Sequence, residues 1–107
     1  MASDESQITG DRRAAKRYHC KPATLVPLYL TGASTSLDAW GWDLSATGIS
    51  LDMPCSLDVG TAVVLRPTKS LLMPARVVHA TKRHNGTWRI GCKFDHQLDS
   101  ETLEALL

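Results

Sequence analysis

The sequence predicts an all-β fold: a small six-stranded antiparallel β-barrel followed by a short C-terminal α-helix. Three observations carry this prediction. Short β-rich segments recur at a spacing of roughly ten residues, turn residues separate them, and a single helical pattern stands at the end of the chain. The chain has 107 residues, 43% of them hydrophobic and 21% charged. This length suits one globular domain, because each half alone would bury too small a core.

The first predicted strand covers residues 21–31. Pro22 and Pro27 exclude a central helix there and favour a strand with one exposed edge. A polar loop follows this strand. Two short strands are then expected at 42–45 and 48–54, on either side of a Ser-Ala-Thr-Gly turn. In the second of them three apolar residues alternate with polar ones and should face the core: Ile49, Leu51 and Met53.

The second half of the barrel is predicted from three further segments. Residues 61–67 are rich in β-branched residues and stop at a proline, whereas 71–83 form a longer extended run with a bulge expected at Pro74. The Asn-Gly pair at 85–86 is the strongest hairpin signal in the chain and should fold this run back onto residues 87–94. The alternation in that last strand favours a buried Trp88, while Trp40 and Trp42 flank the earlier turn.

The chain is therefore divided into a disordered tail (1–10) and one domain (11–107). The domain begins with a basic segment (11–21), continues with the barrel (22–97) and ends with a helix (99–107). Asp99 or Ser100 can cap that helix, and three leucines form its apolar stripe: Leu103, Leu106 and Leu107.

Composition and spacing exclude several classes of function. No apolar run approaches the ~20 residues of a membrane span, and the first ten residues lack the features of a signal peptide, so a cytoplasmic protein is expected. The 3 cysteines form no CxxC pair and the 4 histidines no close cluster, so we expect neither a disulfide framework nor a metal site. No nucleophile elbow or phosphate-binding loop motif occurs, and we expect no catalytic residues.

The charge is uneven although the formal net charge is only +1. The segment 11–21 holds one acidic residue, Asp11, and five basic ones, and this patch should attract an anion and be mobile until one binds. The basic residues are Arg12, Arg13, Lys16, Arg17 and Lys21.

Two short motifs carry the chemistry. The first is RxxxR, from Arg13 to Arg17, and the second is DxSxxG, formed by Asp43, Ser45 and Gly48. An arginine fork matches the N7 and O6 acceptors of guanine and also phosphate oxygens, while a carboxylate accepts from guanine N1 and N2. A DxSxxG on its own is more often a simple turn, in which glycine permits a positive φ, but its place behind RxxxR favours a binding site.

In this order, in a small all-β domain with a later Gly-Cys-Lys-Phe sequence at 91–94, the motifs resemble the PilZ domain, a bacterial receptor module for cyclic di-GMP. The resemblance implies a split-barrel fold and a bacterial cyclic di-GMP receptor that changes conformation and signals to a protein partner or a linked effector domain. It assigns Arg13 and Arg17 to guanine edges and phosphates, Asp43 to a guanine Watson–Crick edge, and Ser45 to a supporting hydrogen bond.

The resemblance also extends to stoichiometry. An arginine directly before RxxxR, here Arg12, is associated in the family with an intercalated pair of ligands, so two stacked molecules are expected. Apart from the resemblance, four residues are candidates for the rim of the site, and the sequence leaves open whether they contact a ligand or only solvent: Lys16, Trp42, Arg76 and Arg83.

Two other functions remain open at this stage. One is a ligand-independent PilZ-like adaptor, which the two intact motifs disfavour. The other is a small nucleic-acid-binding barrel, which would need exposed aromatic residues on its strands and is disfavoured because only 6% of the residues are aromatic. No membrane insertion is expected in either case.

Overall fold

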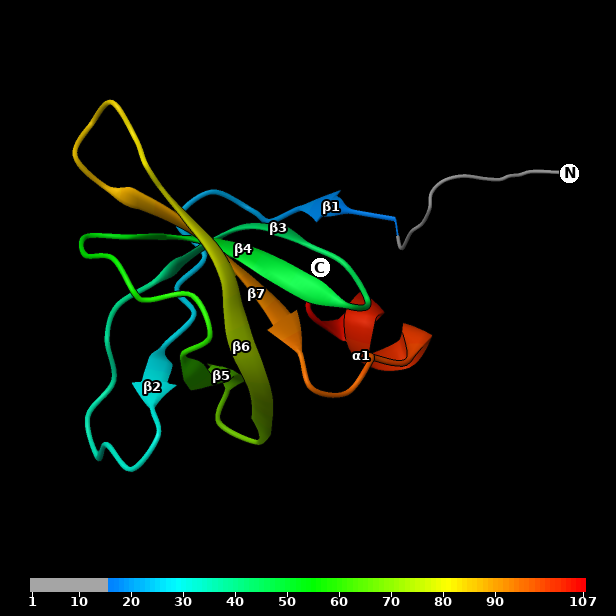
Figure 1. The fold of residues 1–107 in the computed structure, drawn as a ribbon. Helices are drawn as coiled ribbons and strands as arrows, with labels where there is room; N and C mark the ends of the chain where they lie inside the picture. The colour runs from blue at the N-terminus through cyan, green and yellow to red at the C-terminus, as the bar shows by residue number, and fades with distance from the viewer. Residues whose placement is uncertain (1–15) are drawn as a thin grey trace, which may run out of the picture.

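Seven strands and one helix form the part of the chain that the computed structural model describes, residues 16–107 (Figure 1). The predicted tail at 1–10 lies outside the described residues. The elements are β1 (Tyr18–His19), β2 (Leu28–Leu30), β3 (Trp40–Leu44), β4 (Gly48–Met53), β5 (Ala62–Thr68), β6 (Leu71–Lys82), β7 (Trp88–Phe94) and α1 (Ser100–Ala105). Among these residues no helix has the length and apolar character needed to cross a bilayer.

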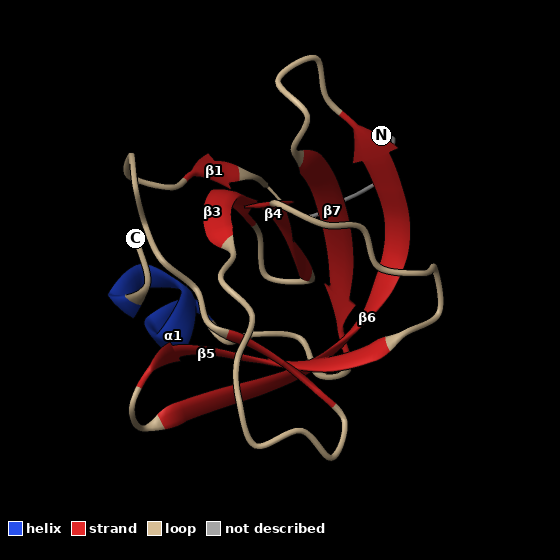
Figure 2. Cartoon of the chain, turned by 90° about the vertical axis from the view of Figure 1, so that its left-hand side faces the viewer, coloured by secondary structure: helices blue, strands red, loops and turns tan. Residues whose placement is uncertain are grey.

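All strands belong to one antiparallel sheet in the order β1-β3-β4-β7-β6-β5-β2. The sheet curls around its core, with α1 beside it (Figure 2). The regular ladders in the described chain leave β1 and β2 as edges, and two isolated bridges, Leu25–Trp40 and Leu28–Leu37, link the neighbourhood of β2 to β3 and the loop before it. The predicted all-β, barrel-like fold is confirmed, although regular strand pairing does not close the barrel.

The core lies on the concave side of the sheet, where apolar residues alternate with outward polar ones. Ile49, Leu51 and Met53 of β4 are 4%, 0% and 1% exposed, as their alternation predicted. Leu51 pairs with Ile90 of β7, which is also fully buried. The central pair of strands therefore buries one face and leaves the other available for a site.

The N-terminal strands differ from the prediction in number and length. A seventh strand, β1, falls within the basic segment, and the strand expected at 21–31 shortens to Leu28–Leu30. Before β2 the backbone bonds to the segment around β3 instead, with Val26 N donating to Ala39 O at 2.7 Å. Pro22 and Pro27 lack an N–H group, and this segment accordingly forms single bridges instead of a continuous ladder.

The bulge expected at Pro74 is wrong. Pro74 pairs opposite Val64 without a shift, and its carbonyl accepts from Asp95 N at 2.9 Å, beyond the end of the β6–β7 ladder. The N and O atoms of a strand residue point to the same side, so the missing N–H of Pro74 costs no bond to β5. The irregularity in β5 lies instead between Leu65 and Thr68, around Pro67.

The hairpin and the helix cap are confirmed. Gly86 has φ +84°, and Arg83 N donates to Thr87 O at 2.8 Å across the turn. At the start of α1, Asp99 accepts from Thr102 N at 2.7 Å, and this bond lowers the pKa of Asp99.

The helix is shorter than the predicted 99–107, because it ends at Ala105. Leu103 and Leu106 pack against the core, as expected for the apolar stripe. Leu107 lies beyond the last turn and is 41% exposed, so its assignment to the stripe is wrong.

Candidate functional site

The second motif lies at the turn between β3 and β4. Asp43 is near the end of β3, where it pairs with His19 of β1 on one side and with Ser50 of β4 on the other. A register shift in β3 between Gly41 and Asp43 accompanies this arrangement. Asp43 is thus held between two neighbouring strands on the outer face of the sheet.

Arg17, the last residue of the first motif, contacts this carboxylate directly. Its Nη2 lies 2.5 Å from Asp43 Oδ1, its Nε lies 3.1 Å from the same oxygen, and Nη2 also donates to Ser50 Oγ at 3.3 Å. The side chains of Arg17 and Asp43 are 48% and 19% exposed. The fold therefore brings together the described ends of the two motifs, while Arg12 and Arg13 lie outside the described residues.

The described part of the basic segment is more structured than predicted. The expectation that residues 11–21 move freely lies outside the described residues for 11–15. Around β1 the segment is paired in this structure, since Tyr18 and His19 pair with β3 and Cys20 N donates to Trp42 O at 2.9 Å, and its predicted mobility without ligand stays a prediction. Arg17 is therefore placed by an edge strand, not by ligand alone.

The electrostatics of Asp43 result from opposed influences. Partial burial is the largest single one and raises its pKa, but hydrogen bonds and charge from Arg17, with smaller effects of Ser50 and Arg89, together lower the pKa below 3.8. Asp43 is thus an anion at neutral pH in spite of its burial.

The stability supplied by Arg17 should therefore depend on pH only in acid. A carboxyl with a depressed folded-state pKa stabilises the fold above its ordinary value of 3.8, and this stability is lost as the pH falls through the folded-state pKa. A carboxyl NMR titration should show the Asp43 midpoint below 3.8, and Arg17→Ala should raise it. Asp99 is the control, since its lowered pKa depends on Thr102. An Asp43 midpoint that Arg17→Ala leaves unchanged would contradict the ion pair.

Ser45 is fully buried inside the turn. Its Oγ accepts from the backbone N–H groups of Thr47 and Gly48, both at 3.2 Å, and lies 3.2 Å from Thr47 Oγ1. Its own N–H donates to Gly48 O at 2.9 Å. The hydroxyl thus holds the shape of the turn in this structure, and its predicted bond to a ligand stays a prediction.

Gly48 is required for a different reason than the sequence suggested. Its φ is not positive; among described residues the positive-φ glycines are Gly32, Gly60 and Gly86. Instead, a Cβ atom at Gly48 would lie 2.4 Å from the carbonyl oxygen of Cys92 on β7. The expectation of a left-handed turn residue is wrong, because the constraint is a close approach between two strands.

Beside Asp43, a tryptophan and two arginines form a second cluster on the outer face. Trp42 is 42% exposed, and the guanidinium carbons of Arg89 and Arg83 lie 4.3 Å and 5.9 Å from its ring centroid. Asp52 of β4 binds both arginines, at 2.6 Å to Arg89 Nε and 3.2 Å to Arg83 Nη1. The ring of His19 meets the ring of Trp42 edge-on at 5.7 Å.

Sequence reasoning missed two members of this cluster, Asp52 and Arg89. The alternation of 88–94 places Arg89 outward, which was the available signal. Its neighbours depend on the register that pairs Asp52 with Arg89 across β4 and β7, and the alternation alone does not fix that register.

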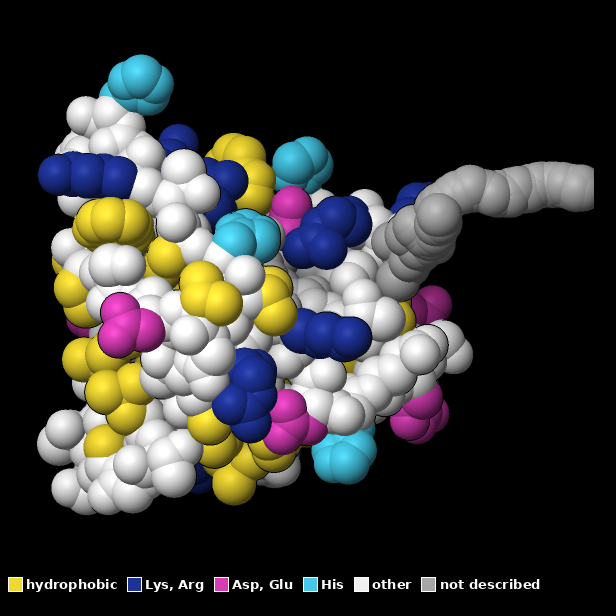
Figure 3. All heavy atoms as spheres, viewed as in Figure 1, with side chains coloured by type: hydrophobic (Ala, Val, Ile, Leu, Met, Phe, Trp, Pro, Cys, Tyr) yellow, Lys and Arg dark blue, Asp and Glu magenta, His cyan; other side chains and the backbone are white. Residues whose placement is uncertain are grey.

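The other two predicted rim residues, Lys16 and Arg76, contact different groups. The Nζ of Lys16 is 5.2 Å from the ring centroid of Tyr18, next to Arg17 in the chain. Arg76 of β6 donates through Nη1 to Gly60 O at 2.7 Å, on the side of β6 that faces β5. Figure 3 shows one face of the molecule, on which lysine, arginine and histidine side chains lie among acidic and hydrophobic ones.

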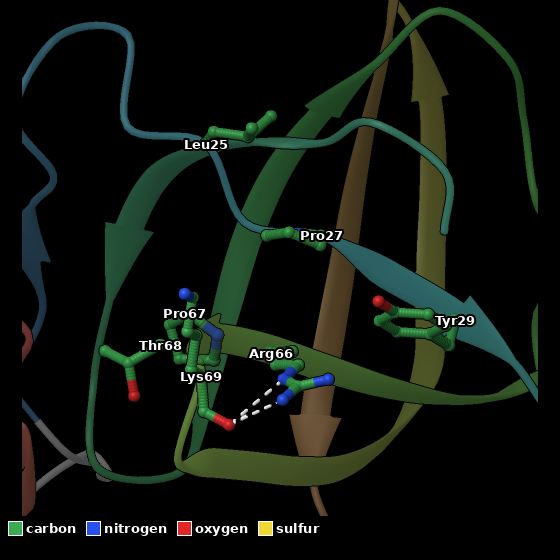
Figure 4. A pocket seen from close by; sticks show the side chains of 7 residues that line it. All are labelled: Leu25, Pro27, Tyr29, Arg66, Pro67, Thr68 and Lys69. Atoms are coloured by element: carbon green, nitrogen blue, oxygen red, sulfur yellow. Dashed lines mark hydrogen bonds between the residues drawn. The ribbon is translucent and has the colours of Figure 1, made fainter. Parts of the chain in front are cut away.

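A shallow hollow of about 540 Å³ lies elsewhere, between β2 and β5 (Figure 4). Pro27, Tyr29 and Pro67 line it together with Arg66, which donates to Lys69 O at 2.7 Å and 3.2 Å. None of the described motif residues lines this hollow. The described motif residues lie instead on the outer face of the sheet, around β3 and β4.

The cysteine and histidine side chains are candidate metal ligands, and the cysteines are also thiols. Among residues 16–107 no group of three or more His, Cys, Asp or Glu side chains is placed to hold a metal ion. Cys20, Cys55 and Cys92 are free thiols, and burial raises the pKa of Cys92 to about 11.

Comparison with known proteins shows what family model and what solved folds this chain resembles. The family model described as the PilZ domain matches residues 11–107. Searching the curated proteins gave no significant match. Three solved structures have a similar fold: YcgR from Escherichia coli in complex with c-di-GMP (TM-score 0.64, 19% identity), the PilZ domain of E. coli YcgR with c-di-GMP (0.62, 16%), and the Bacillus subtilis inhibitor of motility MotI/DgrA (0.60, 15%).

The extent of these matches differs between the neighbours. The alignments cover 89%, 90% and 91% of this chain, in the same order. This chain spans 42% of the first structure, 86% of the second and 48% of the third. At these identities the likeness concerns the fold.

Proposed function

The chain belongs to the PilZ domain family, and from this premise we propose that it is a cytoplasmic receptor domain for cyclic di-GMP. The observation that carries the proposal is the contact of Arg17 with Asp43 and Ser50, which unites the two motifs on one outward surface. Two structural neighbours were solved with c-di-GMP, which supports the same ligand class. A receptor of this kind binds its ligand without chemical change, so the proposal includes no catalytic step.

The described groups suit a guanine nucleotide. Arg17 donates to Oδ1 of Asp43, and a side-chain hydrogen bond with Ser50 also lowers the pKa of this carboxyl. A carboxylate has about four lone-pair positions, so Asp43 can accept from guanine N1 or N2 as well. The Arg17 fork suits phosphate oxygens or the O6 and N7 edge of the base. Arg12 and Arg13 precede Arg17 in the chain and add charge for a second, intercalated ligand molecule.

Binding would change the edge of the sheet. Arg17 directly precedes β1, which pairs only Tyr18 and His19 with β3. A ligand that draws Arg17 away from Asp43 would shift this short strand and the segment before it. We propose that this shift signals to a protein partner or a linked domain.

Calorimetric titration with cyclic di-GMP, cyclic di-AMP and GMP tests the proposal. We expect binding of cyclic di-GMP and rejection of cyclic di-AMP, because adenine replaces the O6 acceptor with an amino donor that faces the arginine fork. From Arg12 we expect a stoichiometry of two ligand molecules per chain. A stoichiometry of one would contradict the intercalated pair and leave the rest of the proposal unchanged. A single-stranded oligonucleotide that bound in place of cyclic di-GMP would favour the nucleic-acid alternative. No binding of any nucleotide would favour the adaptor.

Asp43 separates base recognition from attraction of phosphate. If the surface only attracted phosphates, Asp43→Ala would tighten binding, because it removes a negative charge near a dianion. If Asp43 accepts from guanine, the same substitution should weaken binding by about 1 to 3 kcal/mol, with Asp43→Asn between the two. Circular dichroism of both variants controls for the fold.

A further inference from the structure

We propose that Arg89 of β7 is a further ligand-binding residue, which binds a phosphate of the cyclic dinucleotide while stacked on Trp42 and held by Asp52. This inference rests on the proposed function, since it adds to the same surface a residue outside both motifs. Three features of the outer face lead to it: the register, the way the guanidinium is fixed, and the local charge.

The register places Arg89 beside the motif residues. Asp43 pairs with Ser50, and Ser50 pairs with Gly91, so these three form one row across β3, β4 and β7. Asp52 and Arg89 form the next row on the same face. Gly91 is the residue of β7 opposite Ser50, and it has no side chain. No side chain at this position of β7 therefore separates Arg89 from Ser50.

The place of a side chain at Gly91 is taken by His79 of β6. A Cβ atom on Gly91 would lie 2.3 Å from His79 Nε2, so the imidazole covers the glycine. Any larger residue at 91 would displace this ring. The surface between Asp43 and β6 thus has a floor of Ser50, Gly91 and the His79 ring, and Arg89 stands at one side of it.

The Arg89 guanidinium is fixed before any ligand arrives. Its Nε donates to Asp52 Oδ1 at 2.6 Å, and its carbon lies 4.3 Å from the centroid of the Trp42 ring. Its Nη1 and Nη2 make no hydrogen bond within residues 16–107, and the side chain is 21% exposed. A planar fork with one nitrogen anchored and two free can bind two phosphate oxygens at little cost in side-chain entropy.

The net charge of the cluster around Asp52 is positive and favours an anion. Asp52 is one carboxylate shared between two arginines, Arg83 and Arg89, so the cluster keeps a positive surplus. The same Arg89 charge reaches Asp43, since it helps to lower the pKa of that carboxyl. Arg17 and Arg89 therefore flank Asp43 and Ser50 with cations, and a ligand with two phosphates can engage both.

In this arrangement Trp42 holds the Arg89 side chain in position. One side of its ring is covered by the Arg89 guanidinium, so the indole positions this cation by cation–π attraction. Trp42 is then a positioning residue, and the base of the ligand does not need to stack on it.

Three matched variants test the inference by calorimetric titration with cyclic di-GMP. Arg89→Gln should weaken binding about tenfold or more, because it removes the fork. Asp52→Asn keeps the arginine and an oxygen that can accept from its Nε, but it weakens this anchor while it removes a negative charge. These two effects oppose each other, so the affinity should change by less than about threefold. Arg66→Gln removes one positive charge at the hollow between β2 and β5 and should leave binding unchanged.

The outcomes separate this inference from the proposed function. A loss in Arg89→Gln that clearly exceeds the change in Asp52→Asn supports it. Equal weakening by both overturns it, because binding then depends on the ion pair and not on the Arg89 fork. Wild-type affinity in Arg89→Gln overturns it while the receptor function stands, whereas a wild-type chain that binds no cyclic di-GMP overturns both.

Substitutions at Trp42 give a second, independent readout. Trp42→Phe keeps an aromatic face under Arg89 and should hold the affinity within about threefold, whereas Trp42→Leu should lose about fivefold. In the Arg89→Gln background the two Trp42 variants should bind alike, because no cation remains to position. A Trp42→Leu loss that persists in that background would mean that the ligand touches the indole itself, and would overturn the positioning role.

Discussion

Gly48→Ala should lower the free energy of unfolding by about 3 kcal/mol, at the upper end of the usual cost of overpacking. The added methyl group would lie 2.4 Å from the Cys92 carbonyl oxygen, and β4 and β7 would have to separate at the centre of the sheet. For a domain of this size the midpoint of thermal unfolding should fall by about 15 °C. Urea unfolding followed by circular dichroism measures the change.

Gly41→Ala is the matched control for this prediction. A Cβ atom there would lie 2.9 Å from the Sγ of Cys20, which is a side-chain atom that can rotate away. We expect a cost of about 1 kcal/mol or less. Equal losses in the two variants would show that the approach of the β7 backbone is not what requires glycine at position 48.

Arg17→Ala should have the largest effect on ligand affinity, a loss of about 2 to 4 kcal/mol for cyclic di-GMP, because a charged contact in the bound state is removed. Stability of the free protein should change by about 1 kcal/mol or less, since its ion pair with Asp43 is 48% exposed on the arginine side. Titration calorimetry and thermal unfolding, carried out on the same preparation, measure the two quantities.

Lys21→Ala serves as the control in the same basic segment. Lys21 is exposed and has an equal charge, so its loss should alter the affinity only slightly through the general field. If Arg17→Ala lowered stability severely while affinity changed little, Arg17 would be a structural residue of the edge strand. If Lys21→Ala weakened binding as much, the segment would attract the ligand by charge without a specific contact.

The fold was most predictable where one strand carries its own pattern. β4 and β7 have bounds close to those expected, because both alternate apolar and polar residues over several positions. β1 and β2 have two and three residues, too few for a period, and their existence depends on the strands beside them. The role of Pro74 was misjudged for the same reason, since the side to which its missing N–H points follows from the pairing.

The candidate site was likewise predictable only in part. Arg17, Asp43, Ser45 and Gly48 were found as motif residues, yet the burial of Ser45 and the carbonyl facing Gly48 are properties of the folded turn. Asp52 and Arg89 are 37 positions apart in the sequence and belong to no motif. Their contact arises from the register of two strands whose outward residues gave no local sign of being partners.

In β3, β4 and β7 the residues that the proposed ligand would contact alternate with residues that form the core. Ligand binding constrains the outward residues, and folding constrains the inward ones. Asp43 is followed by the buried Leu44, Ser50 stands between the buried Ile49 and Leu51, and Arg89 precedes the buried Ile90. Each outward residue is thus one peptide unit from a core residue that fixes its backbone. The outward residues can therefore change so that the domain binds another ligand or none, while the inward residues keep it folded. A conserved fold in a homologue is thus poor evidence that the homologue still binds the same ligand.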